Sequence, residues 1–424
     1  MSFDEERAGR TLRTGLLHIE PPASGVEVER IVHAGRRAER RARIATAVGG
    51  AALAVAVGVP VAVAAVRGGH PESGPAQQPV VSATKPADCT VSALNRSGPG
   101  GELQAVDPTG RIVLGINGSS LVRWRDGVSE VIATSDIGGV LMPAAVNSAG
   151  VAVGTYVAVE QPRPTGWILR DGALTPLALP AGARTATPMA INEAGDVVGA
   201  MMPESLATQS VLVVWPAGSP GSPRLIEPDV AAVPVGITAD GSVVGTVLGF
   251  AGRQETVAVW GPDGARRDLP IPAGFIKASA TVVRGDTVYG TAAKDGPVSP
   301  RSHDDLVLPS EKQTPTQGTN PDFVDPRSPV RWNLRDGRST VYPVTGALIT
   351  AASTGWILAG TLDSFEGRIA AVSPEGTRYA LPAPKGTLGA VLGRWISDDG
   401  RAVVGAAVVT PGAFSPFTWT CTHR

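Results

Sequence analysis

The stretch Ala190-Ile191-Asn192-Glu193-Ala194-Gly195-Asp196-Val197-Val198-Gly199 contains the pattern that decides the fold. It reads as an apolar strand, a tight turn and a second apolar strand. Asn192 is placed to bond its side chain to the backbone of the turn, and Gly195 supplies the positive φ that closes it. The valines after the turn favour an extended conformation. The stretch therefore predicts two adjacent β-strands joined by an Asx-type turn.

The same pattern recurs along the chain after residue 100. The turn positions of its copies are Asp107 with Gly110, Asn147 with Gly150, Asn192 with Gly195, Asp240 with Gly241, and Asp399 with Gly400. The glycine that ends the second strand falls at positions 115, 154, 199, 245, 290, 360 and 405, in steps of 39 to 46 residues except for one of 70. A period of about 40 to 50 residues built from short strands is typical of β-propeller blades. The sequence therefore predicts seven units, one of which contains an insertion.

The later half of most units carries a strand that ends near a tryptophan and is followed by a hairpin turn. Asp-Gly between two apolar runs is a strong hairpin signal, and it occurs at 126–127, 171–172, 263–264 and 336–337. Each unit then has four strands, which make one blade. We therefore expect an all-β fold over residues 89–424, a seven-bladed β-propeller with four strands per blade.

This part of the chain resembles the HAF-type extracellular repeat proteins, of an actinobacterial single-pass membrane type. Their units have the form IN-x-x-G-x-V-V-G, followed by an apolar strand with tryptophan and an Asp-Gly turn. The resemblance is clear in the units at Ile191 and Ile237. It implies a propeller fold and an extracytoplasmic setting, and it implies no common activity.

The N-terminal part of the chain differs in composition from the repeats. Residues 1–43 form a polar, arginine-rich tail, helical or disordered, that is too short to bury a core. Residues 44–66 hold no charge and reach about 35 Å as a helix, enough to cross a bilayer. Five arginines lie between residues 36 and 43, so the positive-inside rule predicts a cytoplasmic tail and an extracytoplasmic C-terminal part. The alternative is a cleaved signal peptide, whose apolar run is usually about 7 to 15 residues long and follows a short basic segment.

Two stretches are predicted to be irregular. Residues 67–88 are rich in proline, glycine and serine and form a linker between the membrane segment and the propeller. Residues 294–329 form an insertion in the fifth unit, which explains its longer step. The insertion contains His303, Asp304 and Asp305, which are too few for an oxygen-ligand metal site.

The sequence offers no constellation of residues for catalysis. The five histidines lie at positions 18, 33, 70, 303 and 423, and none stands in the pattern with serine or cysteine that nucleophilic catalysis uses. The strands expected to line a central channel are apolar and lack an acid and base pair for hydrolysis. The formal net charge of −1 gives no reason to expect nucleic acid as a partner. We therefore expect neither enzyme activity nor a cofactor or metal, and we interpret the polar turn residues as structural.

Two function classes remain. The first is a non-catalytic propeller that is anchored in the membrane and binds an extracytoplasmic protein, glycan or cell-wall component. The alternative is a transmembrane signalling component, because the arginine-rich tail is similar to the stems of actinobacterial anti-sigma-like proteins and would engage a cytoplasmic protein. The tail lacks a His-x-x-x-Cys-x-x-Cys zinc motif, which counts against this alternative. A propeller hydrolase is the least favoured class.

The two cysteines indicate how the repeat array closes. The last unit stops at residues 417–421 with its tryptophan-bearing strand and lacks a fourth strand, whereas residues 89–94 align with a fourth strand, 172–177. The two chain ends would then complete the seventh blade together and remove an exposed sheet edge. Cys89 and Cys421 would face each other, and an extracytoplasmic location would let a disulfide persist. Two unrelated buried thiols are the alternative.

Overall fold

A computed structural model describes residues 85–94, 101–134, 139–158, 165–203, 211–249, 254–294, 326–360, 369–388, 391–410 and 413–422. The expected tail (1–43) and apolar segment (44–66) lie outside these ranges, as do most of the linker and of the insertion. Every regular element in the described ranges is a β-strand, which confirms the all-β prediction for them. Within these ranges no helix is long and apolar enough to cross a membrane.

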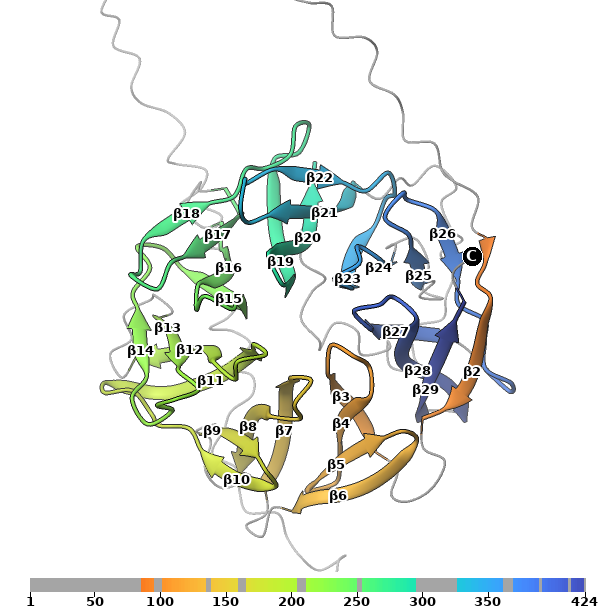
Figure 1. Ribbon diagram of the computed structural model, residues 1–424, viewed down its shortest axis with the longest axis horizontal. Coiled ribbons are helices and arrows are strands. Elements are labelled where there is room, and N and C mark those ends of the chain that lie inside the picture. Colours follow the sequence, from red (N-terminus) through yellow and green to blue (C-terminus); the bar gives the residue numbers. More distant parts are fainter. Residues whose placement is uncertain are drawn as a thin grey trace, which may run out of the picture. The chain divides into compact units, whose positions relative to one another are not determined.

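Apart from the short strand β1 (Lys85–Pro86), the described strands form seven groups of four, which we call units 1 to 7, around a common centre (Figure 1). Unit 1 contains β3 (Glu102–Val106), β4 (Ile112–Asn117), β5 (Ser120–Arg125) and β6 (Val128–Thr134). Unit 2 contains β7 (Gly139–Val146), β8 (Ala152–Ala158), β9 (Thr165–Arg170) and β10 (Ala173–Pro176). Unit 3 contains β11 (Ala183–Ile191), β12 (Val197–Pro203), β13 (Val211–Trp215) and β14 (Arg224–Ile226). Neighbouring strands within each unit are antiparallel. A single parallel residue pair between β9 and β11 joins units 2 and 3 into one eight-stranded sheet.

The remaining units repeat this arrangement, with the first strand of each nearest the centre (Figure 1). Unit 4 contains β15 (Ala232–Ile237), β16 (Val243–Val247), β17 (Thr256–Trp260) and β18 (Arg266–Asp268). Unit 5 contains β19 (Lys277–Arg284), β20 (Thr287–Ala293), β21 (Arg327–Asn333) and β22 (Ser339–Val341). Unit 6 contains β23 (Ala347–Ala351), β24 (Ile357–Gly360), β25 (Ile369–Val372) and β26 (Arg378–Ala380). Unit 7 contains β27 (Val391–Ile396), β28 (Ala402–Thr410), β29 (Ala413–Cys421) and β2 (Cys89–Ala93).

Unit 7 is built from both ends of the described chain. Strand β2 pairs antiparallel with β29, and Cys89 lies opposite Cys421 in this pair. The two cysteines form a disulfide, with Cα atoms 4.0 Å apart and a sequence separation of 332 residues. Both the expected disulfide and the completion of the last unit by a strand from before the first unit are confirmed. A buried cluster that includes Leu94, Trp124 and Val404 packs units 7 and 1 together.

Two expected boundaries need correction. The linker was expected to extend to residue 88, but the structure has a short strand β1 (Lys85–Pro86), which pairs parallel with β26, and Ala87 N donates to Ala380 O at 2.9 Å. The insertion was expected to extend to residue 329, but β21 begins at Arg327. Proline concealed strand pairing in both cases. Pro86 lies in the edge strand β1, where no donor is needed, whereas Pro329 lies near the start of the inner strand β21 and its carbonyl accepts from Tyr342 N at 2.9 Å.

A β-bulge interrupts the first strand of every described unit, and it explains the recurring glycine. The residues skipped in the register are Gln104, Ala144, Met189, Val235, Thr281, Ile349 and Arg394. The bulge brings a carbonyl oxygen over the second strand, so a Cβ on Gly290 would overlap with Ser279 O. The same overlap arises at positions 115, 154, 199, 245 and 405. The expected repeat glycine of unit 6 needs correction, because Ala359 and not Gly360 pairs with Leu348 before the bulge. A Cβ on Gly360, one position later, would meet only side-chain atoms, 3.4 Å or more away.

The core lies between neighbouring units and is dominated by tryptophans of the third strands. Trp124, Trp215, Trp260, Trp332 and Trp419 are each 1% exposed or less. Burial of a side chain of this size contributes about 5 kcal/mol of transfer free energy as an upper estimate. Several indole nitrogens also donate to a carbonyl of the preceding unit, as Trp332 Nε1 does to Pro270 O at 2.8 Å. The tryptophans therefore hold successive units together.

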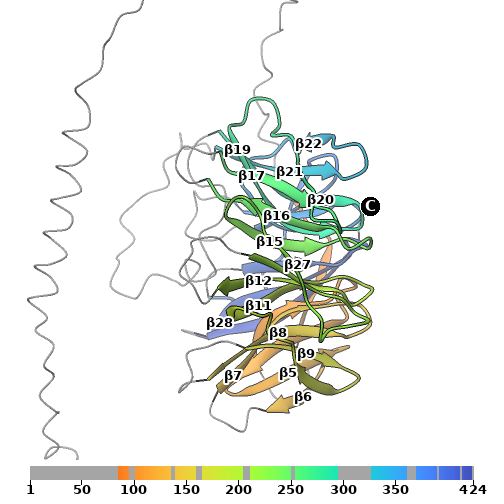
Figure 2. The same cartoon turned by 90° about the vertical axis from the view of Figure 1, so that its left-hand side faces the viewer.

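The alternating strand directions define two faces. The turn face carries the connections between first and second strands and the hairpins between third and fourth strands. The other connections lie on the opposite face, which we call the loop face; Figure 2 shows the strands running between the two. The hairpins 126–127 and 171–172 have positive φ at both the aspartate and the glycine, as a type I′ turn requires.

Candidate functional site

The turn residues predicted from the sequence lie on the turn face, each between the first and second strand of its unit. Their glycines, Gly110, Gly150, Gly195, Gly241 and Gly400, have φ between 74° and 90°. The polar side chains cap the same turns. Asn147 Oδ1 accepts from Val151 N at 3.0 Å, Asp107 Oδ1 accepts from Ile112 N at 2.6 Å, and Asp399 Oδ1 accepts from Arg401 N at 2.9 Å.

Asp240 and Asn192 make equivalent bonds within their turns. Asp240 Oδ1 accepts from Ser242 N at 3.2 Å, and Asn192 Oδ1 accepts from Asp196 N at 2.8 Å. The hydroxyl of Thr238, followed by the amide of Ser242, holds the pKa of Asp240 below its usual value against the effect of burial. These interactions give the polar turn residues a structural task, because each satisfies a backbone donor that the turn leaves unpaired.

Side chains and backbone donors also join one turn to the next, and we call this series of turns the turn ring. Asn147 Nδ2 donates to Asn192 O at 3.1 Å, and Asn192 Nδ2 donates to Thr238 O at 2.9 Å. Thr238 has no side-chain amide, so this series of hydrogen bonds from one turn to the next ends there. The later units use other donors, because Ser353 Oγ donates to Asp398 O at 3.1 Å and Asp398 N donates to Pro108 O at 2.7 Å.

Four charged side chains from units 1, 3, 5 and 7 interact at the turn ring, and we call them the central charge cluster: Asp107, Glu193, Arg284 and Asp398. The Arg284 side chain is 17% exposed, and its Nε lies 3.2 Å from Asp398 Oδ1. The same Nε donates to Ala351 O at 3.1 Å. Arg284 therefore joins unit 5 to units 6 and 7.

Burial dominates the electrostatics of this cluster. It lowers the pKa of Arg284, and the charges of Asp398, Glu193 and Asp107 oppose this effect. It raises the pKa of Asp398, which the charge of Arg284 opposes. Among the described residues, Asp398 Oδ1 accepts no hydrogen bond although it is buried. We interpret the central charge cluster as structural, because it joins separate units on the turn face.

No motif in the sequence points to Arg284, because the turn of unit 5, Arg284-Gly285-Asp286-Thr287, does not follow the repeated pattern. The first strands of the other units predict an apolar centre. The structure instead places this buried cation 3.2 Å from Asp398, which precedes the predicted Asp399, and the charge of the turn residue Asp107 acts on it from unit 1. That these side chains lie together could be predicted only from the fold, which determines which turns meet at the centre.

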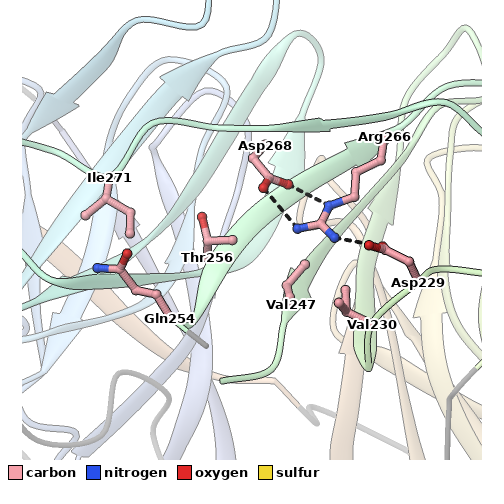
Figure 3. A pocket seen from close by; sticks show the side chains of 8 residues that line it. All are labelled: Asp229, Val230, Val247, Gln254, Thr256, Arg266, Asp268 and Ile271. Atoms are coloured by element: carbon pink, nitrogen blue, oxygen red, sulfur yellow. Dashed lines mark hydrogen bonds and ion pairs between the residues drawn. The ribbon is translucent and has the colours of Figure 1, made fainter. Parts of the chain in front are cut away.

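A cavity of about 500 Å³ lies at the loop-face end of unit 4, and we call it the unit 4 cavity. Figure 3 shows Gln254 and Ile271 on one side, Thr256 between, and a charged group on the other side. The lining residues are Asp229, Val230, Val247, Gln254, Thr256, Arg266, Asp268 and Ile271. They come from β16, β17 and β18, from the connection between β16 and β17, and from the connections on either side of the unit. None was predicted, because the cavity depends on connections that carry no repeated motif.

Arg266 organises the charged side of the unit 4 cavity. It donates from Nε to Asp268 Oδ1 at 2.7 Å, from Nη2 to Asp268 Oδ2 at 2.9 Å, and from Nη1 to Asp229 Oδ1 at 2.9 Å (Figure 3). Burial lowers the pKa of Arg266, but its hydrogen bonds to Asp268 and Asp229 outweigh burial and raise it overall. The three side chains form a fixed polar wall. Among the described residues, no three His, Cys, Asp or Glu side chains are grouped to hold a metal ion.

Comparison with solved structures identifies the type of fold. An oligogalacturonate lyase in complex with manganese aligns with a TM-score of 0.50 at 11% identity, over 81% of this chain and 98% of its own. The fold is of the propeller type. A gluconolactonase from Xanthomonas campestris aligns over 82% of this chain and 99% of its own, with a TM-score of 0.38 and 13% identity.

The propeller-type fold is all that these similarities establish. TolB from Acinetobacter baumannii aligns with a TM-score of 0.39 at 12% identity, and the match covers 62% of this chain but only 59% of TolB. No family model and no curated protein matches the sequence. At identities this low the shared feature is the propeller-type fold, and function has to be argued from the sites.

Proposed function

We propose that this chain is a membrane-anchored, extracytoplasmic seven-bladed β-propeller that binds a protein, glycan or cell-wall ligand without catalysing a reaction. The observation that carries the proposal is the Cys89–Cys421 disulfide. Reducing compartments keep cysteines as thiols, whereas extracytoplasmic proteins retain disulfides. Both cysteines of the chain are used in this one bond. It joins the two ends of the repeat array, where it supports closure of a seven-bladed ring.

The contacts between units 7 and 1 also support a closed ring. Asp398 N donates to Pro108 O at 2.7 Å on the turn face, and Val404 shares a buried cluster with Trp124 between the sheets. A closed ring leaves no first or last unit with an unpartnered face. The charge-free segment 44–66 and the arginines before it support the membrane anchor and a cytoplasmic N-terminus.

The polar sites support binding rather than catalysis. In the unit 4 cavity, the two carboxyl groups accept hydrogen bonds from one guanidinium, so neither is placed as a proton donor. In the central charge cluster, Asp107 and Glu193 are engaged with their own and neighbouring turns. The proposed function therefore involves no cofactor and no nucleic acid.

Protease treatment of intact cells tests the topology. Epitope tags would be placed before residue 10 and after residue 424 of the full chain. We expect added protease to remove the C-terminal tag and leave the N-terminal tag protected. Protection of both tags, or loss of the N-terminal tag alone, would contradict the proposed orientation. Peptide mapping without reductant should also recover Cys89 linked to Cys421, and free thiols at both positions would remove the main support.

A further inference from the structure

We infer that the unit 4 cavity binds a neutral, hydroxyl-rich saccharide. This inference rests on the proposed function as a binding module and names a ligand class and a site for it. A volume of about 500 Å³ lies within the range of small-molecule sites, about 300 to 1,000 Å³. The walls combine fixed polar groups with apolar side chains, as a ligand with both kinds of surface requires.

The charges of the unit 4 cavity disfavour a strongly charged ligand of either sign. An anion would face the carboxylates of Asp229 and Asp268. A cation would face Arg266, which already fills the position between these carboxylates and makes three hydrogen bonds to them. The Arg266 side chain is only 24% exposed, so a ligand cation would have to displace a partly buried guanidinium. A neutral ligand is neither repelled by the two carboxylates nor required to displace the Arg266 guanidinium.

The uncharged polar groups match hydroxyls. The side chains of Gln254 and Thr256 make no hydrogen bond to other described residues, and each can donate and accept. Sugar hydroxyls have the same dual capacity. They can also donate to the free lone pairs of the two carboxylates, and such charge-assisted bonds are stronger than neutral ones.

The apolar part of the lining suits the C–H surface of a sugar ring. Val230 is 7% exposed and Val247 is 2% exposed, and Ile271 packs against the buried cluster between units 4 and 5. These side chains are fixed by the core behind them. The unit 4 cavity is therefore largely preformed, which lowers the entropic cost of binding.

Calorimetric titration of the full-length chain tests this inference. The protein would be kept in a detergent without a sugar headgroup, because such a headgroup would compete for the site. The probes are the neutral trisaccharides maltotriose, cellotriose and triacetylchitotriose, with trigalacturonate as the anionic comparison and spermidine as the cationic one. We expect saturable binding of at least one neutral trisaccharide and none of the charged probes.

Variants locate the binding in the unit 4 cavity. Thr256→Val removes a hydroxyl at nearly constant shape, and Gln254→Met removes the amide. Each should weaken binding of the neutral trisaccharide at least about tenfold with an unchanged melting temperature. Glu130→Gln, which alters an exposed ion pair with Arg123 in unit 1, is the matched control and should have no effect on binding.

Three outcomes would overturn the inference: no saturable binding of any neutral trisaccharide to the folded protein, preference for a charged probe, or binding that both cavity variants leave unchanged. These outcomes are independent of the protease test. An extracytoplasmic propeller that fails to bind these sugars would lose the saccharide site and retain the proposed topology.

Discussion

The Arg284 side chain links three units on the turn face. Its Nε donates to Ala351 O in unit 6 and lies 3.2 Å from Asp398 Oδ1 in unit 7. Removing one partner of a buried pair leaves the other charge uncompensated, and this loss usually exceeds the net contribution of the pair. Substitution of Arg284 by Met keeps the apolar stem and isolates the effect of the charge.

We expect Arg284→Met to lower the free energy of unfolding by about 1 to 2 kcal/mol near neutral pH, discounted because the Asp398 side chain is 38% exposed. Burial raises the pKa of Asp398 above 3.8. The contribution of Asp398 to the free energy of unfolding is therefore present below the pKa that this side chain has in the unfolded chain. It is lost as the pH rises through the pKa that the side chain has in the folded protein. Without Arg284 the folded pKa rises further, so the variant should lose more stability than the wild type between about pH 4 and pH 7.

Urea unfolding at these two pH values measures the effect. Asp398→Asn in the Arg284→Met background is the control, because it removes the titrating carboxyl and should flatten the pH dependence. Identical pH dependence in the wild type and in Arg284→Met would show that the two side chains are not coupled in the folded protein.

The β-bulge in the first strand is the element that sets where glycine is required. Gly290 faces a carbonyl oxygen brought close by the bulge of β19, whereas Gly360 faces only flexible side chains. The two glycines differ in their place in the repeat. Gly290 pairs with Ala280 just before the bulge, whereas in unit 6 Ala359 holds this place opposite Leu348 and Gly360 follows it. The two positions therefore compare a second-strand glycine that faces the bulge with one that does not.

We expect Gly290→Ala to destabilise the protein by about 2 to 4 kcal/mol, because the new methyl group overlaps with backbone that cannot move without breaking the strand pairing. Gly360→Ala should change stability by less than about 1 kcal/mol, since the Ile349 and Ile369 side chains can adjust. Thermal and denaturant unfolding of both variants measures the difference. Equal costs at the two positions would contradict the role assigned to the bulge.

Local patterns account for the elements that the sequence predicts well. The turn glycines, the Asp-Gly hairpins and the tryptophan strands each need particular residues within a few positions, so each leaves a motif. The bulges leave none, because the skipped residues range from Ala144 to Arg394 and are defined by register with another strand. The unit 4 cavity and Arg284 were missed for a related reason, since both depend on segments that meet only in the folded chain.

At the scale of the whole molecule, the disulfide closes a loop of over 300 residues, and the double variant Cys89→Ser, Cys421→Ser tests its contribution. The chain-entropy estimate for such a loop is about 5 kcal/mol, an upper figure because measured effects are often smaller. We expect the variant to unfold at a clearly lower urea concentration than the oxidised wild type. Reductant should lower the wild type to the same midpoint and leave the variant unchanged. A wild type insensitive to reductant would show that the remaining β2 contacts suffice for closure.

The position of the disulfide along the chain also determines how the protein responds to tension. In the proposed anchored state, a pull between the membrane and a bound ligand enters the propeller through Lys85 and reaches Cys89, the first residue of β2. Without a covalent bond at Cys89, tension would separate β2 from β29 one residue pair at a time, starting at this end of the strand. The Cys89–Cys421 bond passes the force to β29 before any of these pairs is strained. In that proposed state, tension between the membrane and a bound ligand would leave the β2–β29 pairing of unit 7 intact.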